Sequence, residues 1–291
     1  MERLFLRNVL LKNYCTWRVG GPARFFYEPR DAGELKKALV WAHAGGTPVF
    51  VLGRGSNLLI SDKGYDGLVI RTADQLTAIR FDGPRAEAEC GAYFGGFLEA
   101  CADRGLSGLE DLYDIPGTVG GAVFMNAGAF ETSVADRLVE VVSLDAKGVE
   151  HRRPVAELAF AYRDSLFRHN NETIVRACFM LSAGEPAVLR ARLAETLRKR
   201  NDKQPPDRNR SCGSVFKRPP GGYAGTLIDK AGLKGLRIGG ARVSEKHANF
   251  IINDNSATAA DIAALIDKVR TRVHAFCGVR LETEVIYLGE F

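Results

Sequence analysis

Two glycine-rich segments constrain the fold of this chain more than any other feature: Gly53-Arg54-Gly55-Ser56-Asn57 and Ile115–Ala122. The first follows the apolar run Val49–Leu52, which predicts a strand, so its Gly-x-Gly pattern invites a Rossmann dinucleotide site. That site needs a third glycine and then a helix. Leu58 occupies the glycine position, and residues 58–72 carry strand and turn signals. The sequence therefore excludes a Rossmann fold.

Glycine lets a backbone bend sharply and lets a phosphate approach its N–H groups closely. Gly117, Gly120 and Gly121, with the hydroxyl of Thr118, meet this requirement in the second segment, and residues 53–57 meet it in the first. Either segment alone is equally well explained as a structural turn. Together they favour an extended ligand with several anionic or polar groups.

Composition places the chain among ordinary globular proteins, with 46% hydrophobic and 26% charged residues. The net charge of +5 favours anionic ligands, but basic and acidic residues are interleaved, which argues against nucleic-acid binding. The one dense basic stretch, residues 198–210, is expected to be a solvated helix end and loop, with an anion-facing loop as the alternative.

The six cysteines are scattered without a Cys-x-x-Cys pair, and no histidine lies at zinc-ligand spacing, so we expect no disulfide framework and no metal site. No apolar run reaches membrane-spanning length, and the N-terminus lacks the apolar core of a signal peptide. We therefore expect a cytoplasmic enzyme without membrane contact.

Helical patterns and strand-like runs are mixed along the chain, which predicts an α+β protein. The expected helices cover residues 31–46, 93–104 and 186–200 and a long one capped by Thr258. The expected strands cover residues 49–52, 76–81, 86–90, 138–144, 149–153, 173–181, 214–217 and 281–288. The proline- and glycine-rich residues 201–222 indicate loop, and a domain boundary is expected near the helix before Asn201.

Several polar side chains could carry chemistry. Arg163, in Tyr162-Arg163-Asp164-Ser165, could clamp a carboxylate or phosphate, or simply lie in a surface turn. Ser214 begins a predicted strand with no histidine near it in sequence, so a proton donor is as plausible as a nucleophile. Glu284 lies in an apolar run, where a charged carboxylate needs a partner. His247 is the only histidine expected near a site.

Seven segments, in order along nearly the whole chain, resemble the UDP-N-acetylenolpyruvoylglucosamine reductase family. They are residues 13–22, 51–59, 115–129, 162–165, 213–217, 248–253 and 281–285. The resemblance implies a two-lobed FAD-binding domain of the vanillyl-alcohol-oxidase type, followed by a smaller α+β substrate-binding domain. We expect the FAD-binding domain at residues 1–190, with lobes at about 1–72 and 73–190, and the substrate-binding domain at 191–291.

The resemblance also implies a reaction and its residues. NADPH reduces non-covalently bound FAD, which delivers hydride to the enolpyruvyl ether of UDP-N-acetylglucosamine, and the resulting enolate is protonated. In such enzymes the serine of Gly-Ser-Val-Phe-Lys donates the proton, which corresponds to Ser214 here. The matching arginine and glutamate, Arg163 and Glu284, stabilise the enol intermediate, as expected for a concentrated negative charge beside a carboxylate.

Further roles follow from the same resemblance. The substrate is expected to contact Tyr162, Lys217 and Asn249. FAD is expected to be held by Gly53, Arg54, Gly55, Ser56, Asn57, Leu58, Pro116, Gly117, Thr118, Gly120, Gly121, Ala122, Asn126 and Gly128. The short connection after Lys217 is similar to that of the compact subtype, which lacks an inserted tyrosine-bearing loop. Asp114 stands where family members usually have glycine, and Asn209–Cys212 replaces the usual Pro-Ser-Ala.

Two alternative functions remain open. An oxidase of the same fold would share both glycine loops, but it would not be expected to combine Ser214, Arg163 and Glu284. A non-enzymatic nucleotide-binding module is the second alternative. The expected partner is a small nucleotide sugar, with a monomer as the favoured oligomeric state.

Overall fold

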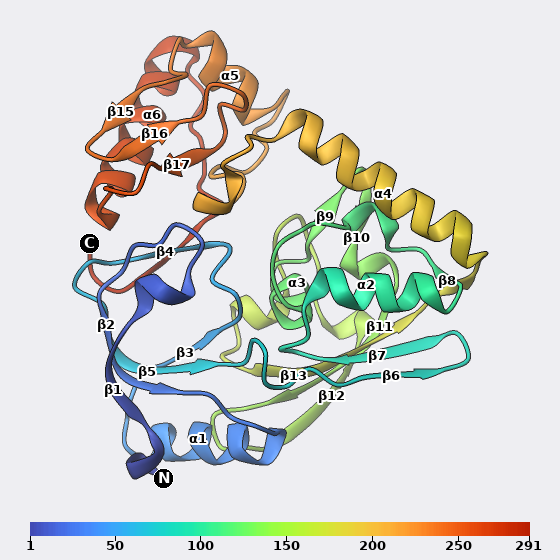
Figure 1. Cartoon of the computed structure of the whole chain (residues 1–291). Coiled ribbons are helices and arrows are strands. Elements are labelled where there is room, and N and C mark those ends of the chain that lie inside the picture. The colour runs from blue at the N-terminus through green and yellow to red at the C-terminus, as the bar shows by residue number, and fades with distance from the viewer. The chain divides into compact units, whose positions relative to one another are not determined.

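The computed structural model describes residues 1–291, and the chain divides into two compact units (Figure 1). Unit 1 comprises Met1–Leu6, Phe26–Arg54 and Gly67–Arg200, and unit 2 comprises Arg7–Phe25, Gly55–Asp66 and Asn201–Phe291. The N-terminal part of the chain therefore contributes to both units. The expected boundaries at residues 72 and 190 concern domains rather than compact units, and they stay a prediction.

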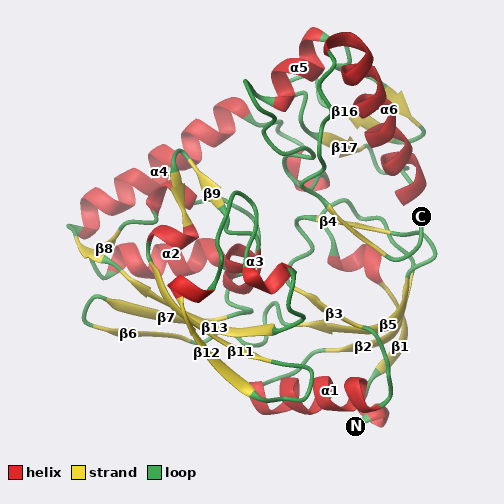
Figure 2. Cartoon of the chain, turned by 180° about the vertical axis from the view of Figure 1, so that it is seen from behind, coloured by secondary structure: helices red, strands yellow, loops and turns green.

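A five-stranded antiparallel sheet organises unit 1, in the order β12-β11-β13-β7-β6. Helices α2 (Phe94–Asp103) and α3 (Val119–Phe124) cover one face of it (Figures 1 and 2). Phe97 of α2 meets Phe179 of the central strand with ring centroids 5.1 Å apart. The strands are β6 (Ile79–Asp82), β7 (Arg85–Glu89), β11 (Leu138–Leu144), β12 (Glu150–Pro154) and β13 (Thr173–Met180).

Helix α1 (Ala32–Ala44) begins at Asp31, whose side chain accepts a hydrogen bond from the Glu34 backbone, as the capping pattern predicts. Strand β3 (Val49–Leu52) follows it and pairs in parallel with β5 (Tyr65–Arg71). The chain leaves β3 at Gly53, so a regular strand places the first glycine loop.

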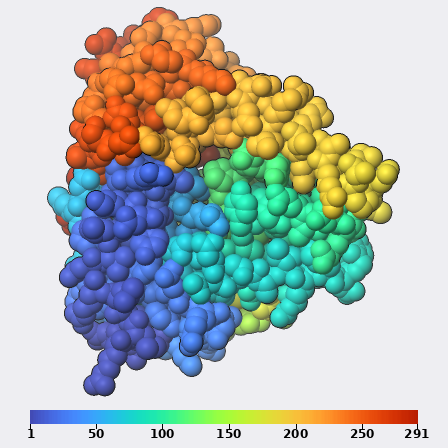
Figure 3. Space-filling view, in the orientation of Figure 1, coloured from blue at the N-terminus to red at the C-terminus, as the bar shows by residue number.

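Helix α4 (Pro186–Lys203) ends unit 1 and is mostly exposed. Its buried apolar residues, Leu189 and Leu193, pack against Ala102 of α2, and Thr196 is buried as well. The helix lies at the molecular surface in the space-filling view (Figure 3). This arrangement confirms the amphipathic helix predicted from the sequence. None of the helices combines the length and the apolar character that crossing a membrane requires.

In unit 2, helices α5 (Ala224–Lys230) and α6 (Ala259–Cys277) pack on a three-stranded sheet of β15 (Arg237–Ile238), β16 (Ala241–Val243) and β17 (Ile251–Asn253). Thr258 caps helix α6 as predicted, and together with Asp261 it forms a capping box. The helix ends at Gly278, which has φ of 73°. Five residues of the predicted apolar stripe are buried: Ile262, Leu265, Ile266, Val269 and Val273. The prediction was wrong for the sixth, Phe276, which is 56% exposed in the last turn of the helix.

Two early segments of the chain complete the core of unit 2. Trp17 is fully buried, its indole N–H donates to the carbonyl of Ile251 at 2.7 Å, and its own carbonyl accepts from Asn253 Nδ2 at 2.7 Å. Strand β4 (Leu58–Ile60) pairs in parallel with β18 (Ile286–Leu288). A strand at Leu58, where a Rossmann fold would have a helix, confirms the exclusion of that fold.

The remaining strands are β1 (Leu6–Leu10), β2 (Pro22–Tyr27) and four strands of two residues each: β8 (Leu106–Ser107), β9 (Gly128–Ala129), β10 (Thr132–Ser133) and β14 (Ser182–Ala183). Two strands predicted from the sequence are not formed over their full length. Residues 281–288 form a regular strand only from Ile286, and residues 214–217 make one isolated bridge in place of a strand.

The start of α6 gives a test of how unit 2 holds residues 55–66. Asp62 accepts hydrogen bonds from the backbone N–H groups of Ala259 at 2.9 Å and Ala260 at 3.0 Å. Asp62→Ala removes both acceptors from the helix N-terminus, and we expect it to lower the free energy of unfolding by about 1 kcal/mol. Urea denaturation measures this.

The matched control is Asp66→Ala. The side chain of Asp66 is 86% exposed and only pairs with Arg24 at 3.3 Å, so its loss should change stability by less than about 0.5 kcal/mol. Equal losses in the two variants would show that Asp62 does not anchor the helix.

Candidate functional site

The two predicted glycine loops meet in unit 1. A Cβ atom added to Gly53 would lie 2.9 Å from Thr118 Oγ1, closer than two such atoms normally approach. Gly53 is therefore required because the loop after β3 lies directly against the loop that starts α3. This contact supports one ligand site built from both loops.

Backbone donors at Gly117 and Thr118 fit an anionic group. Gly117 has φ of 146°, a conformation that side chains rarely allow, and the Thr118 hydroxyl accepts from the Gly121 N–H at 3.2 Å to cap α3. The carbonyl of Gly117 binds Phe94, but no hydrogen bond within the chain uses the N–H groups of Gly117 and Thr118. These N–H groups can bind the phosphates of FAD.

The two glycines at the start of α3 have different roles. A Cβ on Gly120 would lie 2.8 Å from the Cβ of Cys90, and the Gly120 N–H donates to the Cys90 carbonyl at 2.9 Å. Gly120 thus lets the helix pack closely on the chain after β7. Gly121 is exposed, and only Thr118 Oγ1, at 3.5 Å, lies near its added Cβ, so it leaves room for a ligand.

Arg54 is already engaged by its neighbours. Its guanidinium lies 2.7 Å from a carboxylate oxygen of Asp74 and 4.8 Å from the ring centroid of Tyr93. Tyr93 also forms a bridge with Thr118, which places this exposed ring beside the glycine loop. Sequence reasoning missed Tyr93, although an aromatic residue just before a helix was visible there.

Asp114 adopts a left-handed backbone with φ of 64°, the conformation that the usual glycine would adopt without strain. Its carboxylate lies 3.6 Å from Nε of Arg200 near the end of α4. Asp114 thus combines a glycine-like backbone conformation with an ion pair.

The Tyr162–Ser165 segment forms a tight turn in unit 1, with an isolated bridge between Ala161 and Asp164. Arg163 has φ of 56°, and its Nη2 donates to the carbonyl of Gly128 at 3.0 Å. Asn126 Nδ2 donates to the carbonyl of Ala161 at 3.0 Å. The structure thus brings Arg163 onto the end of the predicted flavin motif.

The rest of the first glycine loop belongs to unit 2. Gly55 has φ of 61°, and a Cβ there would lie 2.2 Å from the carbonyl oxygen of Tyr14. The Gly55 carbonyl accepts from the Thr16 N–H at 3.2 Å. Asn57 Nδ2 donates to the carbonyl of Glu284 at 3.2 Å. Three predicted motifs therefore meet around this loop.

Ser214 is half-buried and follows Gly213, whose φ of 75° turns the chain. No hydrogen bond within the protein occupies its hydroxyl. The Glu284 N–H donates to the carbonyl of Val215 at 2.8 Å, so the residues beside Ser214 lie against the segment that carries Glu284. The half-burial of Glu284 confirms the expectation of a partly buried carboxylate in this run.

Lys217 and Asn249 flank the same segment. The ammonium of Lys217 lies 3.6 Å from the exposed carboxylate of Glu282. The backbone N–H of Lys217 donates to the backbone carbonyl of Glu282 at 2.9 Å. Asn249 is buried, and its side-chain amide binds the backbone of Phe216. The Lys217 side chain thus pairs with Glu282, whereas the Asn249 side chain faces the protein backbone.

Two further groups lie near these residues. His247 Nδ1 accepts from the Asn249 N–H at 3.3 Å, and burial lowers the pKa of the His247 imidazole. Cys212 is fully buried, which raises the pKa of its thiol well above the usual range, and the charge of Glu284 adds to this rise. Cys212 is therefore a protonated packing group rather than a nucleophile.

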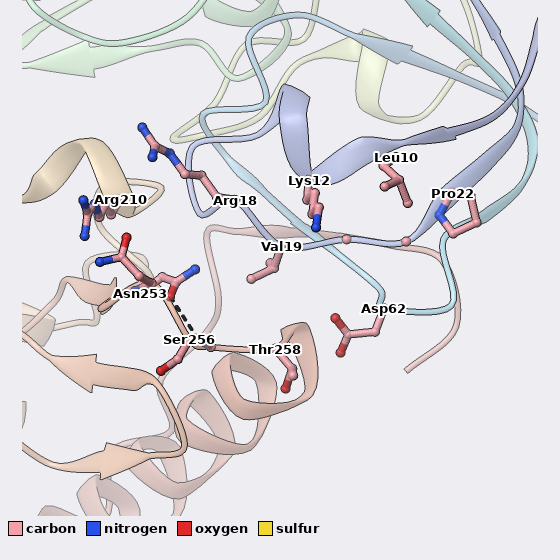
Figure 4. A pocket seen from close by; sticks show the side chains of 14 residues that line it. Leu10, Lys12, Arg18, Val19, Pro22, Asp62, Arg210, Asn253, Ser256 and Thr258 are labelled. Carbon is pink, nitrogen blue, oxygen red and sulfur yellow. Dashed lines mark hydrogen bonds between the residues drawn. The ribbon is translucent and has the colours of Figure 1, made fainter.

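A separate pocket of about 480 Å³ opens in unit 2 (Figure 4). Lys12, Arg18 and Arg210 contribute basic side chains to its lining, and Asp62 contributes the one carboxylate, which α6 already engages. None of the sequence-predicted site residues lines it. We therefore base no functional assignment on this pocket.

Each unit thus gathers its own set of predicted residues. Unit 1 holds Gly53, Gly117–Ala122, Asn126 and Arg163 around one pair of loops. Unit 2 holds Ser214, Lys217, Asn249 and Glu284 on three adjoining segments, with Gly55–Asn57 beside them. The first set is suited to binding phosphates and the second to acid and charge chemistry.

Comparison with known families matches both parts of this description. Residues 23–152 match the family profile of an FAD binding domain. Residues 204–288 match the C-terminal domain of UDP-N-acetylenolpyruvoylglucosamine reductase. The chain therefore carries an FAD-binding domain followed by the second domain of that reductase.

Relatives that align with nearly the whole chain are reductases of the same name. The UDP-N-acetylenolpyruvoylglucosamine reductase of Moorella thermoacetica is 44% identical over 98% of this chain and 93% of its own length. That of Rubrobacter xylanophilus is 43% identical over 96% of this chain and 94% of its own. The crystal structure of the Thermus caldophilus reductase matches with a TM-score of 0.85 and 37% identity, covering 98% of this chain and all of that one. This chain therefore belongs to the UDP-N-acetylenolpyruvoylglucosamine reductase family.

Proposed function

We propose that this protein reduces the enolpyruvyl ether of UDP-N-acetylglucosamine to UDP-N-acetylmuramate, with NADPH as reductant, in peptidoglycan precursor synthesis. The observation that carries the proposal is the arrangement of the family motifs: the glycine loops meet in unit 1, and the Ser214 and Glu284 segments are hydrogen-bonded in unit 2. We further propose that residues 191–291 form the substrate-binding domain, and that the enzyme acts in the cytoplasm as a monomer.

Bound FAD supplies hydride-transfer chemistry, which takes two electrons from NADPH and adds hydride to the enolpyruvyl double bond. The diphosphate of FAD would be held by four residues, Gly53, Gly117, Thr118 and Gly121. They offer backbone N–H groups and, at the glycines, the space that a side chain would fill. The other proposed FAD-binding residues are Arg54, Gly55, Ser56, Asn57, Leu58, Pro116, Gly120, Ala122, Asn126 and Gly128.

FAD is held without a covalent bond. A cysteine tether needs a reactive thiolate, and burial raises the pKa of Cys90 and Cys101 to about 12 and that of Cys15 above its usual value. The remaining thiol that is exposed, Cys277, lies at the end of α6. These buried thiols are therefore poorly suited to a covalent tether.

Ser214 donates the proton that completes the reduction. Hydride and one proton add across the carbon–carbon double bond, and NADPH becomes NADP⁺. The Ser214 hydroxyl has no partner within the protein and is half-buried, so it can turn toward a substrate carbon. A positioned acid of this kind contributes about 10²–10⁴-fold to the rate.

Arg163 and Glu284 stabilise the enolate that precedes protonation. Negative charge on the enolate lies next to the substrate carboxylate, so a fixed guanidinium is most valuable at this stage. The hydrogen bond from Arg163 to the Gly128 carbonyl holds that guanidinium in place before the substrate arrives. Tyr162 and Lys217 contact the substrate.

Ser214→Ala separates the two half-reactions. We expect bleaching of the flavin by NADPH to stay within about twofold of the wild type, while turnover with the enolpyruvyl nucleotide falls by about 10²–10⁴-fold. Anaerobic stopped-flow absorbance measures both steps. Ser256→Ala, a serine outside the proposed machinery of unit 2, should leave both unchanged. An equal loss in both half-reactions of Ser214→Ala would show that Ser214 is not the proton donor.

Gly53→Val tests the flavin site. The added side chain would occupy the space next to Thr118 Oγ1, so we expect FAD affinity to fall at least tenfold, about 1.4 kcal/mol. The measurement is the flavin-to-protein ratio after purification, followed by titration with FAD. Gly222→Ala is the control, because its added Cβ meets nothing within 4 Å. Full flavin content in Gly53→Val would contradict the proposed site.

A further inference from the structure

The side-chain amide of Asn249 forms hydrogen bonds with the backbone of the segment that carries Ser214. Its Oδ1 accepts from the Phe216 N–H at 3.0 Å, and its Nδ2 donates to the Phe216 carbonyl at 2.9 Å. Both bonds are buried, and Asn249 is 7% exposed. The Asn249 carbonyl also accepts from the Val215 N–H at 2.8 Å. One residue thus makes three hydrogen bonds to the two residues after Ser214.

The opposite edge of this segment faces residues 282–284. The Val215 carbonyl accepts from the Glu284 N–H at 2.8 Å, and the Lys217 N–H donates to the Glu282 carbonyl at 2.9 Å. In an extended chain successive residues direct their backbone groups to opposite edges. The N–H and carbonyl of Phe216 therefore point to the edge that lacks a neighbouring strand, where buried polar groups need partners.

The amide of Asn249 supplies those partners. A primary amide presents a donor and an acceptor side by side, as the backbone of a neighbouring strand does, so one side chain satisfies both Phe216 groups. The backbone of Asn249 is itself held, because its N–H donates to His247 Nδ1 at 3.3 Å. The His247 ring in turn packs edge-on against Phe250, with centroids 4.9 Å apart.

We propose that Asn249 is a positioning residue that fixes the extended segment of Ser214 and Lys217, and that it acts through Phe216 rather than through contact with the substrate. This inference rests on the proposed function, and it replaces the substrate contact that the sequence resemblance implies for Asn249. A displacement of reacting groups by about 1 Å can cost about 10²-fold in rate, so the loss of this support should appear mainly in proton transfer.

The test uses the FAD-loaded enzyme and two variants. Asn249→Leu has a similar size and removes both side-chain hydrogen bonds, whereas Asn249→Asp keeps an acceptor for the Phe216 N–H and removes the donor. The dissociation constant of the enolpyruvyl nucleotide is obtained by titration of the oxidised flavin spectrum. The reductive and oxidative half-reactions are followed separately by anaerobic stopped flow.

We expect bleaching by NADPH to be unchanged for both variants. Substrate affinity should fall by less than tenfold, because Lys217 lies in the same segment but its backbone is also held by Glu282. The oxidative half-reaction should slow about 10²-fold in both variants. Asn249→Leu removes both bonds, and Asn249→Asp places a carboxylate oxygen against the Phe216 carbonyl oxygen, which repels it. Asp62→Ala, which weakens unit 2 elsewhere, is the stability-matched control and should leave the oxidative half-reaction unchanged.

A tenfold or greater loss of affinity with an unchanged rate in the bound complex would overturn the inference and make Asn249 a substrate contact. An oxidative half-reaction at the wild-type rate in Asn249→Leu would overturn it as well. Failure of the proposed function is distinguishable, because the wild-type enzyme would then show no oxidative half-reaction. If Asn249→Leu does not fold, Asn249→Asp alone decides, and a wild-type rate in that variant again counts against the inference.

Discussion

Hydrogen bonds hold residues 214–217 between Asn249 on one edge and the 282–284 segment on the other, and the chemistry proposed for unit 2 depends on them. This stretch has no regular secondary structure of its own, since a glycine turn precedes it and only one isolated bridge lies within it. The side-chain amide of Asn249 on one edge and the backbone of residues 282–284 on the other hold the backbone that follows Ser214. The strands and helices of unit 2 serve to bring these segments together.

A second constraint, the lack of space between two loops, shapes unit 1. Gly53 lies so close to Thr118 that no side chain fits, and Gly120 is equally close to Cys90. No hydrogen bond within the chain uses the N–H groups of Gly117 and Thr118, so they remain available as donors. The Thr118 hydroxyl caps α3. Phosphate binding and helix packing thus need glycine at neighbouring positions for different reasons.

Features set by local chemistry were predictable from the sequence. Asp31 and Thr258 cap their helices as expected, because a cap depends on a side chain and a backbone group three residues apart. The apolar stripe of α6 and the exclusion of a Rossmann fold at Leu58 also follow from short-range patterns. The roles of Ser214, Arg163 and Glu284 came from resemblance to a family, and they stay predictions.

Features set by contacts between distant residues were not predictable. Nothing near Trp17 shows that its indole binds the carbonyl of Ile251, and nothing near Asn249 shows that its amide is taken by Phe216. The 214–217 segment was expected to be a strand because its residue types favour one, yet a side chain replaces one neighbouring strand. Gly120 and Gly121 look equivalent in sequence, and only packing distinguishes them.

The central claim is that this chain relays electrons from NADPH to an enolpyruvyl nucleotide. The most direct test is the flavin absorbance of the wild-type protein under anaerobic conditions, first on addition of NADPH and then of UDP-N-acetylglucosamine enolpyruvate. We predict that NADPH bleaches the flavin band and that the nucleotide restores it, with UDP-N-acetylmuramate formed in an amount equal to the flavin. A band that stays bleached after the nucleotide is added, and returns only with oxygen, would contradict the account and favour an oxidase.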